Sequence, residues 1–252
     1  MAVNASFGPH TGWMNPLYAA SWRPSNNLEA RLMAYIDFIL RVHNAAKRNY
    51  VARVTESDKA ACATISKQFG FDYFDGDRKY GYGGFRYDGR WVPVAQDMVK
   101  HYALNSGARI LDIGCAKGFL VHDFMKVLPG ADAVGIDISD YAIANAMPEV
   151  KDRLSVGNAV SLPYPDKSFD LVVSINTLHN LRIYDLEKAL KEIERVGKKH
   201  KYIVMDSYRD EREKVNLLYW QLTCECLFTP QEWEWVFAQC GYTGDYGCIF
   251  FD

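Results

Sequence analysis

The sequence lacks a surplus of charge of either sign. Among its 252 residues, 29 are Lys or Arg and 31 are Asp or Glu, which gives a formal net charge of -2. Proteins that bind nucleic acids or anionic membranes through bulk electrostatics carry a clear basic excess. We therefore predict that its partners include no nucleic acid and no membrane.

The sequence also lacks paired cysteine motifs and long apolar runs. It begins with MAVNASFGPHTGW, without the basic and then apolar residues of a signal peptide, and no stretch approaches a membrane span. Six cysteines form neither CxxC units nor a dense framework, and they lie at positions 62, 115, 224, 226, 240 and 248. These absences predict a cytoplasmic protein with free thiols. We expect Cys224, Cys226 and Cys240 to be core residues, and we predict no metal site.

What the chain has in quantity is apolar and aromatic residues, at 49% and 14%, so a core of normal size can form. We divide it into an N-terminal part, 1–105, and a core domain, 106–252. The N-terminal part is predicted to hold a surface-lying arm at 1–24, a helical apolar spacing from Leu28 to Val54, a helix at 58–69 capped by Ser57, and a helix at 94–104. Between them, FDYFDGDRKYGYGGFRYDGRW shows neither helical nor strand periodicity.

From Ala108 onward, predicted strands alternate with predicted helices. The strands lie at 108–115, 133–139, 153–157, 169–176 and 201–208, and the tail CIFF closes the sheet. The helices run up to Val127, over 140–147, up to Gly197 and from the Thr229 capping box to Gly241. This alternation predicts an α/β fold with a doubly wound, Rossmann-like, mostly parallel sheet, helices on both faces, and an N-terminal helical arm and lid.

The first predicted strand ends in a Gly-rich turn, DIGCAKG, at 112–118. Such a turn lets a cofactor approach the backbone and the following helix N-terminus, although tight packing alone can also require it. Dinucleotide-binding proteins need G-x-G-x-x-G/A, but counting from Gly114 gives Ala116 and then Phe119. This spacing argues against an NAD-linked oxidoreductase. A phosphate-binding P-loop is excluded because no G-K-[ST] follows.

The turn resembles motif I, [DE]-x-G-x-G-x-G, of the class I S-adenosylmethionine-dependent methyltransferases, with Ala116 in place of the second glycine. The resemblance continues over about 108–206, and it implies that S-adenosyl-L-methionine is the cofactor. It implies that Asp137, at the tip of the second strand, binds the ribose hydroxyls, and that Asn158 meets the adenine amine. Asp112 is expected to orient the loop or reach the methionine amine. The implied cofactor-binding residues are Asp112, Gly114, Cys115, Gly118, Asp137, Ile138, Asn158, Ala159, Asn176 and Tyr82.

The residues after the fourth strand, SINTLHN, bear on the reaction. They lack the [DN]-P-P-[YF] motif of the nucleic-acid amino methyltransferases, which argues against base N-methylation. His179 lies where many small-molecule methyltransferases place groups that face the transferred methyl. A histidine there can take a proton from a hydroxyl or amine nucleophile, so we predict that His179 is catalytic. The alternative, that His179 only shapes the pocket, stays open.

The aromatic segment before motif I occupies the position of an N-terminal lid in the family. Its glycines allow a loop to close while aromatic faces shield a sulfonium, and Tyr82 is assigned to the cofactor on this ground. Tyr80, Arg86 and Arg90 are candidates for substrate binding. The alternative is an aromatic loop that only packs on its own helices.

These features predict a methyltransferase for a small-molecule or sugar-like acceptor, methylated on oxygen or nitrogen. An insertion near 207–230 is apolar and aromatic enough to be core or a wall of the acceptor pocket. The N-terminal part is similar to that of bacterial methyltransferases from polysaccharide or natural-product pathways. A non-catalytic S-adenosylmethionine-binding regulatory or scaffold protein is the alternative. The sequence leaves the acceptor and the formation of a homodimer open.

Overall fold

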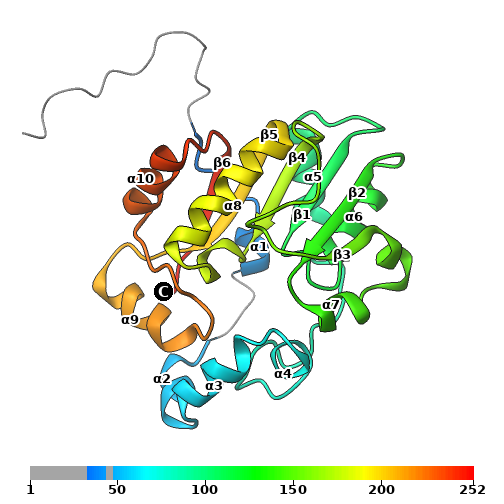
Figure 1. Ribbon diagram of the computed structural model, residues 1–252. Coiled ribbons are helices and arrows are strands. Elements are labelled where there is room, and N and C mark those ends of the chain that lie inside the picture. Colours follow the sequence, from blue (N-terminus) through cyan, green and yellow to red (C-terminus); the bar gives the residue numbers. More distant parts are fainter. Residues whose placement is uncertain (1–32, 44–47) are drawn as a thin grey trace, which may run out of the picture. The chain divides into compact units, whose positions relative to one another are not determined.

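Figure 1 shows the computed structural model, which describes residues 33–43 and 48–252. Its sheet has the strand order β3-β2-β1-β4-β5-β6, and every neighbouring pair is parallel. The strands are β1 (Arg109–Ile113), β2 (Asp132–Asp137), β3 (Leu154–Val156), β4 (Phe169–Ile175), β5 (Gly197–Asp206) and β6 (Asp245–Ile249). The order reverses between β1 and β4, as in a doubly wound sheet, so the predicted fold class is confirmed.

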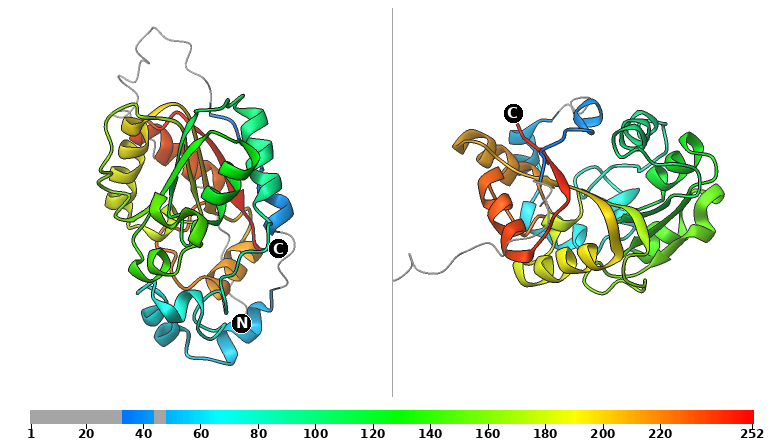
Figure 2. Two further views of the ribbon diagram at one scale, coloured as in Figure 1. Left: turned by 90° about the vertical axis from the view of Figure 1, so that its right-hand side faces the viewer. Right: turned by 90° about the horizontal axis from the view of Figure 1, so that it is seen from above.

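Helices cover both faces of the sheet (Figure 2). Tyr202 and Val204 of β5 belong to one buried cluster, with residues of α5 (Val92–His101) and α6 (Phe119–Val127). Ile203 and Met205 belong to the other cluster, with residues of α8 (Ile183–Val196) and α10 (Pro230–Cys240). Because successive strand residues point to opposite faces, a continuous apolar run is required where both faces are covered.

Helix boundaries follow local signals in several places. Thr229 and Glu232 form the predicted capping box of α10, and Gly241 ends that helix in a left-handed conformation. Gly197 ends α8 as predicted, and β5 begins there, four residues before the predicted start at 201. The helix predicted at 140–147 is shorter: α7 (Asp140–Ala144) precedes a 3-10 helix, η2 (Pro148–Arg153).

The helical spacing predicted from Leu28 to Val54 is wrong for residues 33–39, and Leu28 itself lies outside the described residues, as does the predicted arm at 1–24. Tyr35 forms a parallel bridge with Tyr246 of β6, and the Ile36 N–H donates to the Tyr246 carbonyl at 2.8 Å. These residues pair with the edge strand of the sheet and pack against it, and the spacing of apolar residues in the sequence does not show this pairing. Only α1 (Leu40–His43) and α2 (Tyr50–Thr55) are helical in the described part of this segment.

Short helices precede the first strand. Asp58, rather than the predicted Ser57, caps α3 (Lys59–Ser66), because its carboxylate accepts from the backbone N–H groups at 60 and 61. Next comes α4 (Phe71–Phe74), and the insertion near 207–230 contains α9 (Glu211–Trp220). In Figure 1, α2, α3 and α4 lie near α9 and α7, beyond one end of the strands.

The predicted boundary between residues 105 and 106 falls inside one compact unit of the described residues, which ends at Asp252. Helix α5, on the N-terminal side of that boundary, packs against α6 on its other side. No helix in the described ranges is long and apolar enough to cross a membrane.

Candidate functional site

The turn between β1 and α6 depends on its two glycines. Gly114 has φ +79° and Gly118 has φ +80°, a region that favours glycine. A Cβ atom on Gly114 would lie 1.9 Å from Thr177 Oγ1, and one on Gly118 would lie 2.6 Å from Leu154 Cδ1. Ala116 between them also has a positive φ, of +48°. The turn therefore brings its backbone close to the loop after β4, where no side chain fits.

Two carboxylates lie at the carboxyl ends of neighbouring strands. Asp137 accepts hydrogen bonds from the N–H groups of Ala116 and Ser139, both at 2.8 Å, and burial raises its pKa. Asp112 is 4% exposed, and burial together with the charge of Asp137 raises its pKa to about 8. A buried acid of this kind is readily ionised by a cationic ligand, since an opposite charge lowers its pKa.

A smaller cavity of about 130 Å³ lies beside Asp137. Its lining includes the predicted residues Asp137, Ile138, Asn158, Ala159 and Asn176. The Asn158 side-chain oxygen also accepts from the N–H of residue 160 at 3.1 Å, so this residue shapes its own turn as well.

Two buried polar atoms in this lining have no partner. They are Oδ1 of Asn176 and Oδ1 of Asn180, which accept no hydrogen bond from the described residues. Buried carbonyl oxygens without donors are costly, and they fit a ligand that brings N–H or O–H groups. The sequence predicted Asn176 but missed Asn180.

A larger cavity of about 390 Å³ shares part of its wall with the smaller one, including Tyr82, Gly114 and Asn176. The other predicted residues in its lining are Asp112, Cys115, His179, Arg86 and Arg90. Gly118 and Tyr80 line neither cavity. Gly118 is the N-cap of α6, and the Tyr80 carbonyl accepts a hydrogen bond from the Ser66 hydroxyl at 2.5 Å.

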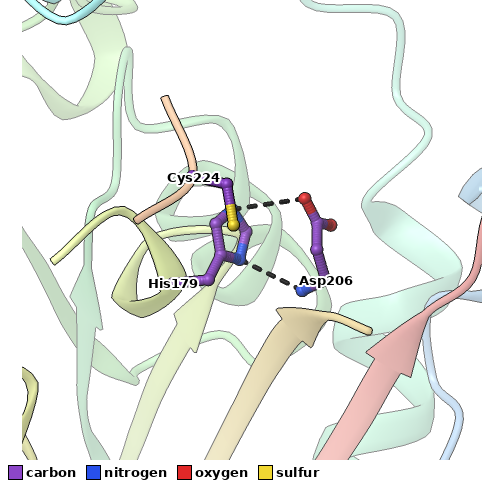
Figure 3. A group of neighbouring side chains, drawn as sticks. All are labelled: His179, Asp206 and Cys224. Carbon is purple, nitrogen blue, oxygen red and sulfur yellow. Dashed lines mark hydrogen bonds and ion pairs between the residues drawn. The ribbon is translucent and has the colours of Figure 1, made fainter. Parts of the chain in front are cut away.

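His179 lies in the wall of the larger cavity and is 2% exposed. It belongs to a 3-10 helix, η3 (Leu178–Asn180), directly after β4. Its Nδ1 accepts from the Asp206 N–H at 3.1 Å, and its Nε2 lies 3.5 Å from Asp206 Oδ2 (Figure 3). Burial lowers the pKa of His179 and raises that of Asp206. The ring is therefore held neutral, with its proton on Nε2 facing the carboxylate.

Cys224 completes a group whose ligand-type atoms all lie within 4.8 Å of one another (Figure 3). A metal-binding histidine donates its second ring N–H to an acceptor, whereas Nδ1 of His179 faces a donor. The Cys224 thiol donates to the Cys226 carbonyl at 3.2 Å, and burial raises its pKa well above the usual range. These contacts fit a hydrogen-bonded group of side chains better than a set of metal ligands.

The aromatic segment 80–87 is docked on the turn after β1. The Tyr82 N–H donates to the Tyr73 carbonyl at 2.8 Å, and Phe85 stacks on Phe119 with ring centroids 4.8 Å apart. Lys117, inside the turn, donates to Asp75 Oδ2 at 2.6 Å and to the Phe85 carbonyl at 3.1 Å. One lysine thus connects the turn to this segment, which we call the lid segment.

Several cavity residues were not identified from the sequence. They are Arg48, Arg53, Arg78, Asp206, Trp220 and Gln221. A signal existed for Asp206, since an acid at the carboxyl end of an apolar parallel strand lies where such sheets bind ligands. The three arginines gave none, because they come from segments that meet only in the fold.

Comparisons with known proteins agree on one family. Residues 104–241 match the family model described as a methyltransferase domain. The chain is 33% identical to a demethylmenaquinone methyltransferase of Roseiflexus sp. (strain RS-1) over 96 residues, which are 37% of this chain and 40% of that protein. It is 31% identical to tRNA (carboxymethyluridine(34)-5-O)-methyltransferase of Arabidopsis thaliana over 130 residues, which are 51% of this chain and 30% of that protein.

Solved structures are also similar to this chain. The YcgJ protein of Bacillus subtilis matches with 24% identity and a TM-score of 0.49, covering 58% of this chain and 66% of that one. The matches span less than half the length of the two curated relatives. Because one of them is named as a tRNA methyltransferase, the comparisons do not support the predicted exclusion of a nucleic-acid partner.

Proposed function

Because the chain belongs to the methyltransferase-domain family, we propose that it is an S-adenosylmethionine-dependent methyltransferase for a small-molecule or sugar-like acceptor. The observation that carries this proposal is the pair of cavities that meet at Tyr82, Gly114 and Asn176. The smaller cavity offers hydrogen-bond acceptor atoms that suit a nucleoside, and the larger cavity holds groups that can exchange protons. The residues that line both cavities would hold the middle of the cofactor, and its methyl group would face the larger cavity.

The residues of the smaller cavity fit the adenosine part of the cofactor. The Asp137 carboxylate can accept from both ribose hydroxyls while it keeps its backbone donors. The unpartnered oxygens of Asn176 and Asn180 suit N–H or O–H donors of the nucleoside. Asp112 and Cys115 line the adjoining part of the larger cavity, where Asp112 suits the methionine ammonium. The cofactor supplies an electrophilic methyl on a sulfonium.

The His179–Asp206 pair supplies a base beside the acceptor. Direct proton transfer to His179 requires a free ring lone pair, but Nδ1 already accepts from the Asp206 N–H. The Asp206 carboxylate takes the proton of a hydroxyl or amine in our proposal, and the Nε2–H of His179 positions that carboxylate. The side-chain amide of Gln221 also donates to Asp206 Oδ2. Orientation of the nucleophile toward the methyl then accounts for most of the rate enhancement.

Calorimetry with S-adenosylmethionine tests the cofactor assignment. Replacing Asp137 with Asn removes a charge-assisted contact, and we expect affinity to fall at least about tenfold, or about 1.5–3 kcal/mol. Asp140→Asn, an exposed carboxylate three residues away, is the matched control and should bind normally. Equal affinity in all three proteins would refute the ribose assignment.

Kinetics test the base. Asp206→Asn should lower kcat by about 10²–10⁴-fold while S-adenosylmethionine affinity stays the same. Since burial raises the pKa of Asp206 and a base must be ionised to accept a proton, the rate should fall as the pH decreases through the raised pKa of this carboxyl group. If the cofactor binds but no methyl is transferred across a broad panel of small hydroxyl and amine acceptors, the regulatory or scaffold alternative is favoured.

We propose further that the protein acts in the cytoplasm, since its six cysteines form no CxxC motif and are free thiols in the structure. The similarity of the N-terminal part to methyltransferases of polysaccharide or natural-product pathways suggests acceptors for the panel. Sugars and their acidic derivatives come first in that panel.

A further inference from the structure

Three guanidinium groups in the wall of the larger cavity gather around one indole ring. The Cζ atoms of Arg48, Arg53 and Arg78 lie 5.6, 5.3 and 5.2 Å from the centroid of the Trp220 ring. All four residues line the cavity. Arg48 lies just before α2, Arg53 lies in its last turn, Arg78 follows α4, and Trp220 ends α9, so the fold brings together positive charges from separate parts of the chain. We call this group the arginine cluster.

The arginine cluster is held in place by neutral groups. Arg53 donates to the carbonyls of Arg78 at 2.7 Å and Trp220 at 3.4 Å, and Arg78 donates to the carbonyl of Gly81. Arg48 Nη2 lies 3.1 Å from His43 Nδ1, while its buried Nε has no partner among the described residues. Carbonyl groups hold Arg53 and Arg78, and a histidine ring holds Arg48, without a negative charge.

No carboxylate in the described part of the chain pairs with Arg48, Arg53 or Arg78. Other arginines of the same protein do pair, and these ion pairs are Arg90–Asp88, Arg195–Glu192 and Arg209–Glu213. Partial desolvation and mutual repulsion lower the pKa of Arg53, and desolvation lowers that of Arg78. Uncompensated charges held together out of water are unfavourable until an anion arrives.

We propose that the arginine cluster binds an anionic group, a carboxylate or a phosphate, of the methyl acceptor. The inference rests on the proposed function and narrows its substrate class. Guanidinium forks match the geometry of both anions and bind them with paired, charge-assisted hydrogen bonds. Cation–π attraction to Trp220 holds the three guanidinium groups without using their N–H groups.

The arginine cluster shares its cavity with the proposed base, Asp206. Trp220 is followed directly by Gln221, whose side-chain amide donates to Asp206 Oδ2. The residue next to Trp220 in the sequence therefore contacts the proposed base, and the arginine cluster and Asp206 line the same cavity. An acceptor in this cavity can place its anionic group on the arginine cluster and its hydroxyl or amine near Asp206.

Anion binding to the full-length protein tests this proposal without knowledge of the acceptor. Inorganic phosphate, pyrophosphate and citrate are titrated by calorimetry at constant ionic strength, with chloride as the balancing salt. We expect saturable binding of at least one of them. A preference for pyrophosphate over citrate identifies a phosphate on the acceptor, and the reverse preference identifies carboxylates. Binding no stronger than that of chloride would overturn the proposal.

Variants test whether the arginine cluster binds an anion or only holds segments of the chain together. Arg48→Gln removes a guanidinium whose hydrogen bond is to a histidine ring, not to the backbone, and it should weaken anion binding at least about tenfold. Arg53→Gln, which keeps an amide donor toward the neighbouring carbonyls, should do the same. Arg182→Gln, at an exposed position outside both cavities, is the control. Unchanged anion affinity in the first two variants would show that the cluster only holds segments together.

The cofactor serves as an independent readout. S-adenosylmethionine affinity should stay within about twofold of the native value in Arg48→Gln, because this residue lines only the larger cavity. Anion binding without cofactor binding would support the subsite and refute the methyltransferase proposal. Cofactor binding without anion binding would support the methyltransferase proposal and refute the anion subsite.

Discussion

At the scale of single residues, the protonation of Asp112 has a measurable consequence. Its pKa of about 8 in the free protein means that it carries a proton at pH 7. If it ionises to bind the methionine ammonium, cofactor binding releases close to one proton. Calorimetry in two buffers of different ionisation enthalpy measures this number, and Asp112→Asn should reduce it to near zero. Proton release that is the same in the native protein and the variant would exclude Asp112 as the source.

The same carboxyl group makes the stability of the free protein depend on pH. Its pKa in the folded state is above the value of about 3.9 for an unfolded chain. The folded state therefore binds more protons between pH 4 and 8, and the contribution of Asp112 to stability is lost as pH rises through this window. Denaturant titrations at several pH values should show this slope in the native protein and a flatter one in Asp112→Asn. Parallel pH curves for the two proteins would contradict the raised pKa.

Ala116 occupies a backbone conformation that favours glycine, and it is also where motif I departs from the family pattern. Ala116→Gly should relieve the strain at φ +48° and raise the free energy of unfolding by up to about 1 kcal/mol. Ala103, with φ +50° at an exposed position outside both cavities, is a matched control. Ala103→Gly should show a similar gain, measured by denaturant unfolding. Stability that falls in both variants would mean that neither backbone is strained.

The residues of motif I could be predicted from sequence because they act through their own turn. Gly114 follows β1, and Asp137, outside motif I, ends β2, so the predicted strand ends together with the family resemblance give their place. Arg53 and Trp220 are 167 residues apart, and only the packing of α2 against α9 brings them together. The sequence also could not show that Nδ1 of His179 accepts a hydrogen bond, since the donor is the N–H of Asp206 at the end of β5.

At the scale of elements, Lys117 connects the turn after β1 to the lid segment. Lys117→Met should keep the apolar stem but remove the ion pair with Asp75, whose pKa its ammonium helps to lower. We expect faster proteolysis within residues 80–90, and a smaller protective effect of S-adenosylhomocysteine than in the native protein. Lys126→Met, at an exposed position in the last turn of α6, is the control. Equal cleavage rates in all proteins would show that the lysine does not hold the lid segment.

The elements themselves were predicted best where local signals and burial agree. The capping box at Thr229 and the buried runs of β1 and β4 specify their conformation within a few residues. Residues 33–39 were assigned wrongly because an apolar spacing compatible with a helix also suits an extended segment on a sheet edge. Tertiary pairing with β6 decides between the two.

At the scale of the whole molecule, Tyr202 anchors the N-terminal segment to the sheet. Its ring is fully buried in β5, and its hydroxyl donates to the Ile36 carbonyl at 2.7 Å. Tyr202→Phe should lower the free energy of unfolding by about 1–2 kcal/mol and increase proteolysis near residues 33–43. Tyr242→Phe removes a comparable but local bond, to the Asp245 carbonyl at 2.8 Å. The control should lose stability without this new cleavage, and cleavage in both variants would contradict the anchoring role.

The buried thiols have a consequence for chemical labelling. Burial raises the pKa of Cys115, Cys224, Cys226, Cys240 and Cys248, that of Cys248 to about 12. Alkylating reagents attack the thiolate, so these side chains react slowly at pH 8. A cysteine introduced at the exposed position of Lys79 would take up a maleimide dye far faster than they do. A fluorophore attached there, directly before the lid segment, tests whether that segment moves when the cofactor is added, against the slow labelling of these five cysteines.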